Sequence, residues 1–136
     1  MTGLTLGGSY LIKAEKRLKA LDVLLAEEDY SDVVREAQEI VELALKGMLR
    51  HIGVEPPKQH DVGSLLLEHA VRFPNDVKSQ LRRLADISKW LRKEREFAFY
   101  GDVDFIPTDE YTKEDAERAR EDARFAVAIA RKAMSA

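Results

Sequence analysis

The chain has 136 residues, a length typical of one compact domain, so we expect a single domain over residues 1–136. It contains no cysteine, which excludes disulfides and thiolate metal sites. Charged residues make up 35% of the chain and leave a formal net charge of −3, without the basic excess that is typical of nucleic-acid-binding proteins. The N-terminal sequence lacks the pattern of a signal peptide, and no apolar run is long enough for a membrane span. We therefore expect a cytoplasmic protein without membrane contact.

Apolar residues at steps of three and four predict a helix over residues 9–27, with Ser9 as its N-cap. A second helix is expected over residues 31–52 and ends before Gly53. Its apolar residues cover much more than one stripe, which is typical of a central helix or of one shared between a core and a partner. Its polar strip consists of Arg35, Glu39, Glu42, Lys46 and Arg50.

Two proline-containing breaks define the next elements, because proline cannot continue a helix. The first break, at residues 54–59, precedes a short helix predicted over residues 61–71. The second, at residues 73–75, precedes a long helix expected over residues 76–99. The inward row of this long helix contains two polar residues, Ser88 and Arg95. We expect both to be buried, which costs free energy unless they are paired.

The last predicted helix follows a loop at residues 100–107. Thr112 and Asp115 have the spacing of a capping box at its start, and the helix runs to about residue 134. Alanines recur along one face of it, and small side chains allow a neighbouring helix to approach closely. Short loops favour antiparallel neighbours. The expected fold is therefore all-α, an up-and-down bundle of four long helices plus one short helix.

Several short motifs occur in a fixed order along nearly the whole chain. They are Tyr10-Leu11 with Ala14-Glu15, Ala37-Gln38 followed by Glu42 to Lys46, the proline loop with His60-Asp61-Val62, and Arg95 followed by Tyr100-Gly101-Asp102. This order resembles that of small stand-alone prokaryotic members of the HEPN domain family. The resemblance implies a homodimer or higher oligomer. It also implies a small nucleotidyltransferase protein as partner, in a toxin–antitoxin-like pair.

Ribonuclease members of that family carry an arginine followed four to six residues later by a histidine. None of residues 96–102, which follow Arg95, is a histidine. Cleavage of RNA without metal needs groups that accept and donate a proton, and histidine suits both roles. Tyr100, with an ordinary pKa of ~10, suits them poorly. We therefore expect no catalytic residue and no ribonuclease activity of the chain alone; a divergent ribonuclease that uses Tyr100 and Arg95 is an alternative.

The resemblance implies that a nucleotide or RNA binds at Arg95, Tyr100, Asp102, Glu42 and Lys46. The guanidinium of Arg95 can bind a phosphate through two hydrogen bonds, and the alternative is an internal ion pair with Glu42 or a loop aspartate. Glu42 and Lys46 lie one helical turn apart. They either orient Arg95 or a phosphate, or they form an ordinary surface pair.

Other polar groups give weaker patterns. His51, His60 and His69 lie on separate predicted elements without the spacing of a metal motif, so no metal site is expected. The acidic loop after Gly101 could hold Mg²⁺ beside a nucleotide, since hard cations prefer oxygen ligands. It lacks the spacing of an ion-binding loop, so a solvated loop is the preferred interpretation. No cofactor is expected beyond a magnesium nucleotide.

Two kinds of function follow from these observations. The first is a HEPN-type protein that binds a nucleotide or RNA end and acts with a partner nucleotidyltransferase. The alternative is a structural homodimer whose role is protein contact alone. The neighbouring open reading frame distinguishes them, because a nucleotidyltransferase encoded there favours the first.

Overall fold

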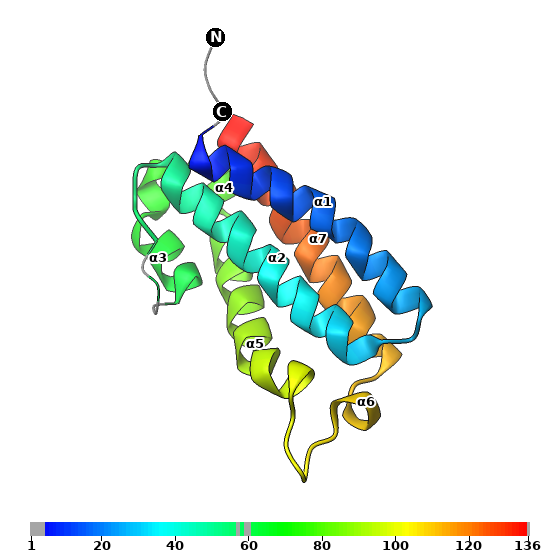
Figure 1. Cartoon of the computed structure of the whole chain (residues 1–136). Coiled ribbons are helices and arrows are strands. Elements are labelled where there is room, and N and C mark those ends of the chain that lie inside the picture. The colour runs from blue at the N-terminus through cyan, green and yellow to red at the C-terminus, as the bar shows by residue number, and fades with distance from the viewer. Residues whose placement is uncertain (1–4, 57, 59–60, 136) are drawn as a thin grey trace.

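Four long helices form the body of the molecule, for which a computed structural model describes residues 5–56, 58 and 61–135. The helices are α1 (Leu6–Ala26), α2 (Tyr30–His51), α5 (Leu81–Phe99) and α7 (Lys113–Ser135). They run alternately up and down, so the start of α1 and the end of α7 lie at the same end of the bundle (Figure 1). The predicted all-α bundle is confirmed.

Short elements connect the long helices. They are α3 (Val62–Glu68), a 3₁₀ turn (Ala70–Arg72), α4 (Asn75–Lys78) and α6 (Pro107–Glu110). The single helix predicted over residues 76–99 is thus divided into α4 and α5. Between them the amide of Gln80 donates to the carbonyl of Val77 at 2.9 Å, a hydrogen bond that tightens the turn before α5 begins. The bundle thus contains more short helices than the one expected. In the described ranges there is no strand, only an isolated bridge between Asp102 and Phe105.

Two helix starts illustrate what local sequence specifies. The N-cap of α1 is Thr5, whose hydroxyl accepts from the amide of Gly8 at 3.0 Å, so the prediction of Ser9 as the N-cap is wrong. The capping box before α7 is confirmed. The amide of Thr112 donates to the carboxylate of Asp115 at 2.9 Å, and the amide of Asp115 donates to the hydroxyl of Thr112 at 3.2 Å.

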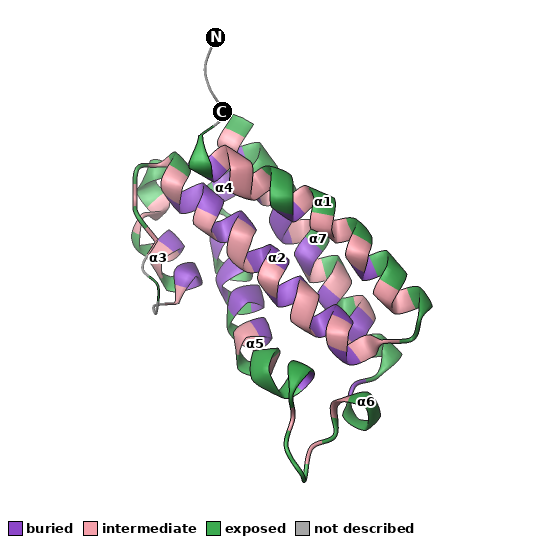
Figure 2. Cartoon of the chain, in the orientation of Figure 1, coloured by how far each residue is buried: buried purple, intermediate pink, exposed green. Residues whose placement is uncertain are grey.

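Helix α2 lies at the centre of the bundle and packs against α1, α5 and α7. Buried residues recur along nearly the whole length of α2, as Figure 2 shows. The apolar surface of α2 that suggested a partner in the sequence is thus covered within the chain itself. Although α2 is broadly apolar, neither it nor another described helix is long and apolar enough to cross a membrane.

The alanine row of α7 is buried against the bundle, as predicted. Its members are Ala116, Ala119, Ala123, Ala126, Ala130 and Ala133. Their small side chains allow α7 to approach α2 closely. Large aliphatic side chains from the other helices fill the remaining core; Leu45, Leu49, Leu84 and Leu91 among them are fully buried.

The loop after α5 is a built turn. Gly101 has a φ of +62°, and a Cβ at this position would lie 2.2 Å from the carbonyl oxygen of Phe105. A carboxylate oxygen of Asp102 accepts from the amide of Asp104 at 2.8 Å. The ring of Phe105 packs edge-on against the ring of Phe97, with 5.3 Å between the ring centres. These contacts fix the direction in which the chain leaves the end of α5.

Candidate functional site

A small polar pocket lies between α2 and the second half of α5. It has a volume of about 120 Å³. Because Gln38, Glu42 and Lys46 are four residues apart, α2 presents all three on one face. Arg92 and Arg95, one turn apart on α5, line the same pocket. Its remaining lining residues are Glu39 and Lys58.

The charges of this pocket are only partly paired. One carboxylate oxygen of Glu42 lies 3.4 Å from Nζ of Lys46, and the other lies 3.6 Å from the guanidinium of Arg92. Glu39 pairs with Arg35 at 3.3 Å. By contrast, neither Arg95 nor Lys58 forms an ion pair with a described residue. The pocket therefore has cationic groups that remain available to an anion.

Gln38 is the most deeply enclosed polar residue of the pocket. Its side chain is 1% exposed, although it lines the pocket. Neither the amide nitrogen nor the amide oxygen has a hydrogen-bond partner among the described residues. Buried amides are nearly always hydrogen-bonded, so an unpartnered one beside a pocket requires a physical explanation.

A larger cleft of about 610 Å³ adjoins the pocket at the end of α5 and shares Arg92 and Arg95 with it. Phe97 and Tyr100 supply aromatic surface to this cleft. Its other lining residues are Arg35, Lys93 and Glu96. The cleft thus combines cations with exposed aromatic rings, a combination typical of surfaces that bind single-stranded nucleic acid.

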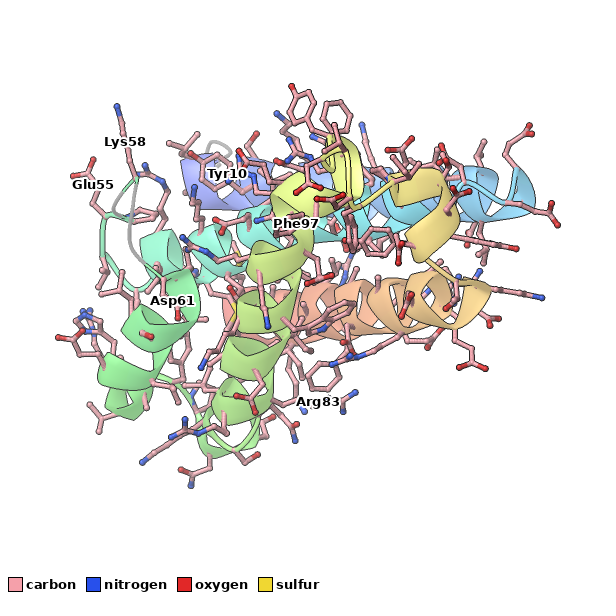
Figure 3. All side chains as sticks on the ribbon, turned by 90° about the horizontal axis from the view of Figure 1, so that it is seen from below. Tyr10, Glu55, Lys58, Asp61, Arg83 and Phe97 are labelled. Carbon is pink, nitrogen blue, oxygen red and sulfur yellow. The ribbon has the colours of Figure 1, made fainter. Side chains whose placement is uncertain are left out.

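A third cleft, of about 460 Å³, adjoins the opposite side of the pocket and shares Lys46 and Lys58 with it. Tyr10, Glu55 and Lys58 lie along one edge of the molecule, and Arg83 projects from the opposite edge (Figure 3). The guanidinium of Arg50 lies over the ring of Tyr10, 5.6 Å from its centre. The three adjoining depressions form one surface, which we call the basic groove.

The basic groove concentrates positive charge in a chain that is acidic as a whole. Its lining contains seven cations and four carboxylates, whereas the formal net charge of the chain is −3. The cations are Arg35, Lys46, Arg50, Lys58, Arg92, Lys93 and Arg95. The net charge of the whole chain therefore did not predict this local excess of positive charge.

The structure brings together four of the five residues expected from the resemblance. Glu42, Lys46 and Arg95 line the same pocket, and Tyr100 lines the adjoining cleft. Asp102 lines none of the depressions of the basic groove; its carboxylate shapes the turn after α5 instead.

The prediction that Arg95 is buried is wrong. The residue is exposed, although Leu91 and Ala98 on the same row are buried. It lines the opening between α5 and α2, and no described carboxylate forms an ion pair with it. The ion pair with Glu42, which was the alternative role for Arg95, is formed by Arg92 instead. Ser88, the other polar residue of that row, is buried as expected.

Sequence reasoning did not single out four residues that line the pocket: Gln38, Glu39, Lys58 and Arg92. The signal for Gln38 was its position one turn before Glu42 on a helix with few uncharged polar residues. The signal for Arg92 was its position one turn before Arg95. Lys58 follows α2 in a loop, where periodicity gives no guidance.

Outside the basic groove, one side-chain hydrogen bond connects two of the long helices. The indole nitrogen of Trp90 donates to Asp122 at 2.9 Å, which ties α5 to α7. The described residues contain no group of three potential ligands that could hold a metal ion. His60, one of the three histidines considered above, lies outside the described residues.

A carboxyl group with a raised pKa lies in the first turn of α2. Burial, together with a hydrogen bond to the neighbouring Asp29 and charge repulsion from it, raises the pKa of Asp32 to about 6. Asp32 lines a cleft with Arg35 and Phe99. Arg35 also lines the basic groove, so this carboxyl lies close to the groove.

Comparison with known protein families gives one result. The model of the HEPN domain matches residues 9–133 of this chain. A comparison with curated proteins finds no match. The match includes α2 and α5 entirely, nearly all of α1 and α7, and every residue of the pocket between α2 and α5. This protein therefore belongs to the HEPN domain family, which links it to functions that involve nucleotides or RNA.

Proposed function

We propose that this protein binds a nucleotide or the end of an RNA in the basic groove and acts with a small nucleotidyltransferase in a toxin–antitoxin-like pair. The observation that carries the binding proposal is the local excess of cations in a chain of net charge −3. Phosphate groups supply the complementary charge, and arginine binds them through paired hydrogen bonds.

The role that we propose for each residue of the groove follows from its exposure and its contacts. Arg95 is exposed and has no described ion-pair partner, so it can bind a phosphate without losing an internal contact. Phe97 and Tyr100 are 44% and 74% exposed, so a base can stack on them. Glu42 holds Arg92 and Lys46 in place and thereby shapes the pocket. Any magnesium ion would arrive with the phosphates, which supply the oxygen ligands it prefers.

A binding titration at several salt concentrations tests this proposal. We expect a ribonucleotide and a short single-stranded RNA to bind, with affinity that falls as salt rises. Arg95→Gln should weaken binding several-fold. Arg82→Gln is the matched control, because Arg82 is an exposed arginine of the same helix that lines none of the three depressions. A wild-type protein that binds neither ligand at low salt would refute the binding proposal.

The partner needs its own test. Co-expression with a small nucleotidyltransferase encoded beside this chain should give a complex that survives purification. Its failure would leave nucleotide binding untouched but remove the toxin–antitoxin part of the proposal.

An exposed apolar patch favours a second candidate function, a homodimer that serves protein contact alone. The patch surrounds the end of α5 and the following loop. It consists of Phe99, Tyr100, Val103 and Ile106, of which Val103 is 91% exposed. Exposed apolar groups that gather in one place mark interaction sites. Dimerisation is compatible with both candidates, so nucleotide binding distinguishes them.

A further inference from the structure

The buried amide of Gln38 determines which part of a ligand the pocket can accept. The amide nitrogen is a donor and the oxygen is an acceptor, and both lack partners among the described residues. Removing such a group from water without compensation costs on the order of 1–3 kcal/mol. A ligand that fits this pocket should therefore present an acceptor and a donor side by side.

A phosphate does not meet this requirement. Its ionised oxygens are acceptors, so they would satisfy the nitrogen of Gln38 and leave the oxygen unpaired. The carboxylates of Glu39 and Glu42, which also line the pocket, would repel it. The phosphate of a bound nucleotide should instead lie at the mouth, where Arg92 and Arg95 line both the pocket and the larger cleft.

A nucleobase is also a poor occupant of this pocket. The edge of adenine could pair with the amide, but its faces need apolar or aromatic walls. Every other residue lining the pocket is charged, and the aromatic rings of Phe97 and Tyr100 lie in the neighbouring cleft. The base of a bound nucleotide should therefore lie outside the pocket.

The two adjacent hydroxyls of a ribose match the pocket. One hydroxyl can donate to the oxygen of Gln38 while the other accepts from its nitrogen. Glu42 or Glu39 can accept from the one remaining hydroxyl hydrogen, which gives the carboxylates of this pocket a role in binding. The volume of about 120 Å³ is smaller than the roughly 300 Å³ at which pockets for whole ligands begin, so it suits one sugar ring.

We propose that the Gln38 pocket recognises the 2′,3′-diol of a terminal ribose, with the adjoining phosphate at Arg92 and Arg95. This inference rests on the proposed function and specifies its ligand. The diol can come from a free 5′-ribonucleotide or from the 3′ end of an RNA. Both present the same sugar hydroxyls and a nearby phosphate.

The first test compares ligands on wild-type protein. AMP is compared with 2′-deoxy-AMP, and a short RNA with a free 3′ end is compared with the same RNA ending in a 2′-deoxynucleotide. We expect the diol to improve affinity about tenfold, the worth of a hydrogen bond of about 1.4 kcal/mol. The tighter of the two diol ligands identifies the source. Equal affinity for ribo and deoxy ligands would overturn the inference and leave the proposed function standing, whereas no binding of any ligand would refute both.

The second test removes the amide. Gln38→Leu should bind the diol and deoxy ligands with about equal affinity. It should keep the salt-dependent binding that the arginines supply. It should not lower the melting temperature, because leucine does not bury unpaired polar atoms. Gln80→Leu, the same change just before α5 and outside the groove, should keep the full preference.

A second variant covers the case in which Gln38→Leu does not fold. Gln38→Asn keeps an amide but withdraws it by one methylene, so the preference for the diol should again fall. A folded variant at position 38 that retains the full tenfold preference would show that Gln38 does not read the diol.

Discussion

The guanidinium of Arg92 lies 3.6 Å from a carboxylate oxygen of Glu42 and connects α5 to α2. Arg95, one turn further along α5, has no such partner among the described residues and is exposed. The two arginines therefore differ in role although both line the same pocket. Arg92 contributes to the packing between two helices as well as to the pocket, whereas Arg95 contributes to the pocket alone.

Substitution by alanine should separate these roles. Arg95→Ala should change the free energy of unfolding by less than about 0.5 kcal/mol, as is usual at exposed positions. Arg92→Ala should cost up to about 1 kcal/mol, because it removes a partly buried ion pair and leaves Glu42 with Lys46 alone. Chemical denaturation of both variants measures the difference. A loss of several kcal/mol for Arg95→Ala would show that this residue has an internal partner.

Ribonuclease activity is the second subject of prediction. Purified protein should leave RNA intact in EDTA, because none of residues 96–102 is a histidine that could transfer protons beside Arg95. Incubation with a labelled RNA at neutral pH tests this, with Arg82→Gln and Arg95→Ala in parallel. Cleavage by wild type and Arg82→Gln that disappears in Arg95→Ala would instead establish a divergent ribonuclease.

The sequence was sufficient for the long helices because their apolar periodicity and their local stop signals agree. Such patterns predicted the central position of α2, the alanine row of α7 and the capping box at Thr112. The division of residues 76–99 was not, because it depends on one tightened turn at Gln80 that has no proline or glycine to mark it. Periodicity predicts which face turns inward but not where a turn tightens.

The functional residues were less predictable for a different reason. The helical periodicity of α5 places Arg95 on its inner face, but a residue on that face is buried only where a neighbouring helix covers it. A long charged side chain can instead reach water through the opening between two helices. Gln38 could not be singled out, because a neutral amide among apolar residues gives no sign of whether its hydrogen bonds are satisfied. Both properties depend on the packing of α5 against α2, which sequence spacing does not specify.

Dimerisation through the patch at the end of α5 is the third prediction. We expect at least a dimer at micromolar concentration, because water-exposed apolar side chains gather there. Val103→Asp should weaken the dimer by placing a charge in the patch. Val71→Asp is the control, because this valine is 83% exposed and lies on the 3₁₀ turn after α3, away from that loop (Figure 1).

Sedimentation velocity of the three proteins provides the measurement. Wild type and Val71→Asp should sediment as dimers and Val103→Asp as a monomer. A wild-type monomer would contradict the patch as a self-association site and would count against both candidate functions.

The fourth prediction concerns pH and Asp32. Burial and the neighbouring Asp29 raise the pKa of this carboxyl to about 6 in the folded protein, whereas an unfolded chain has an ordinary pKa of about 3.9. Between these two values the folded state binds more protons than the unfolded state. Stability supplied by this group is therefore present at the acidic end and is lost as pH rises through about 6. Above that value the charged carboxylate faces Asp29 at a cost.

Asp32→Asn should remove this cost without adding a charge. The free energy of unfolding of the variant, relative to wild type, should therefore rise between about pH 4 and pH 6 and stay level above it. Asp32 is only half-buried, so solvent screening should limit the rise to about 1 kcal/mol. Denaturation across this range measures it, and Asp86→Asn at an exposed position of α5 is the control. A difference that is flat across pH would mean that folding does not shift the pKa of Asp32, and one of the opposite sign would mean that folding lowers it.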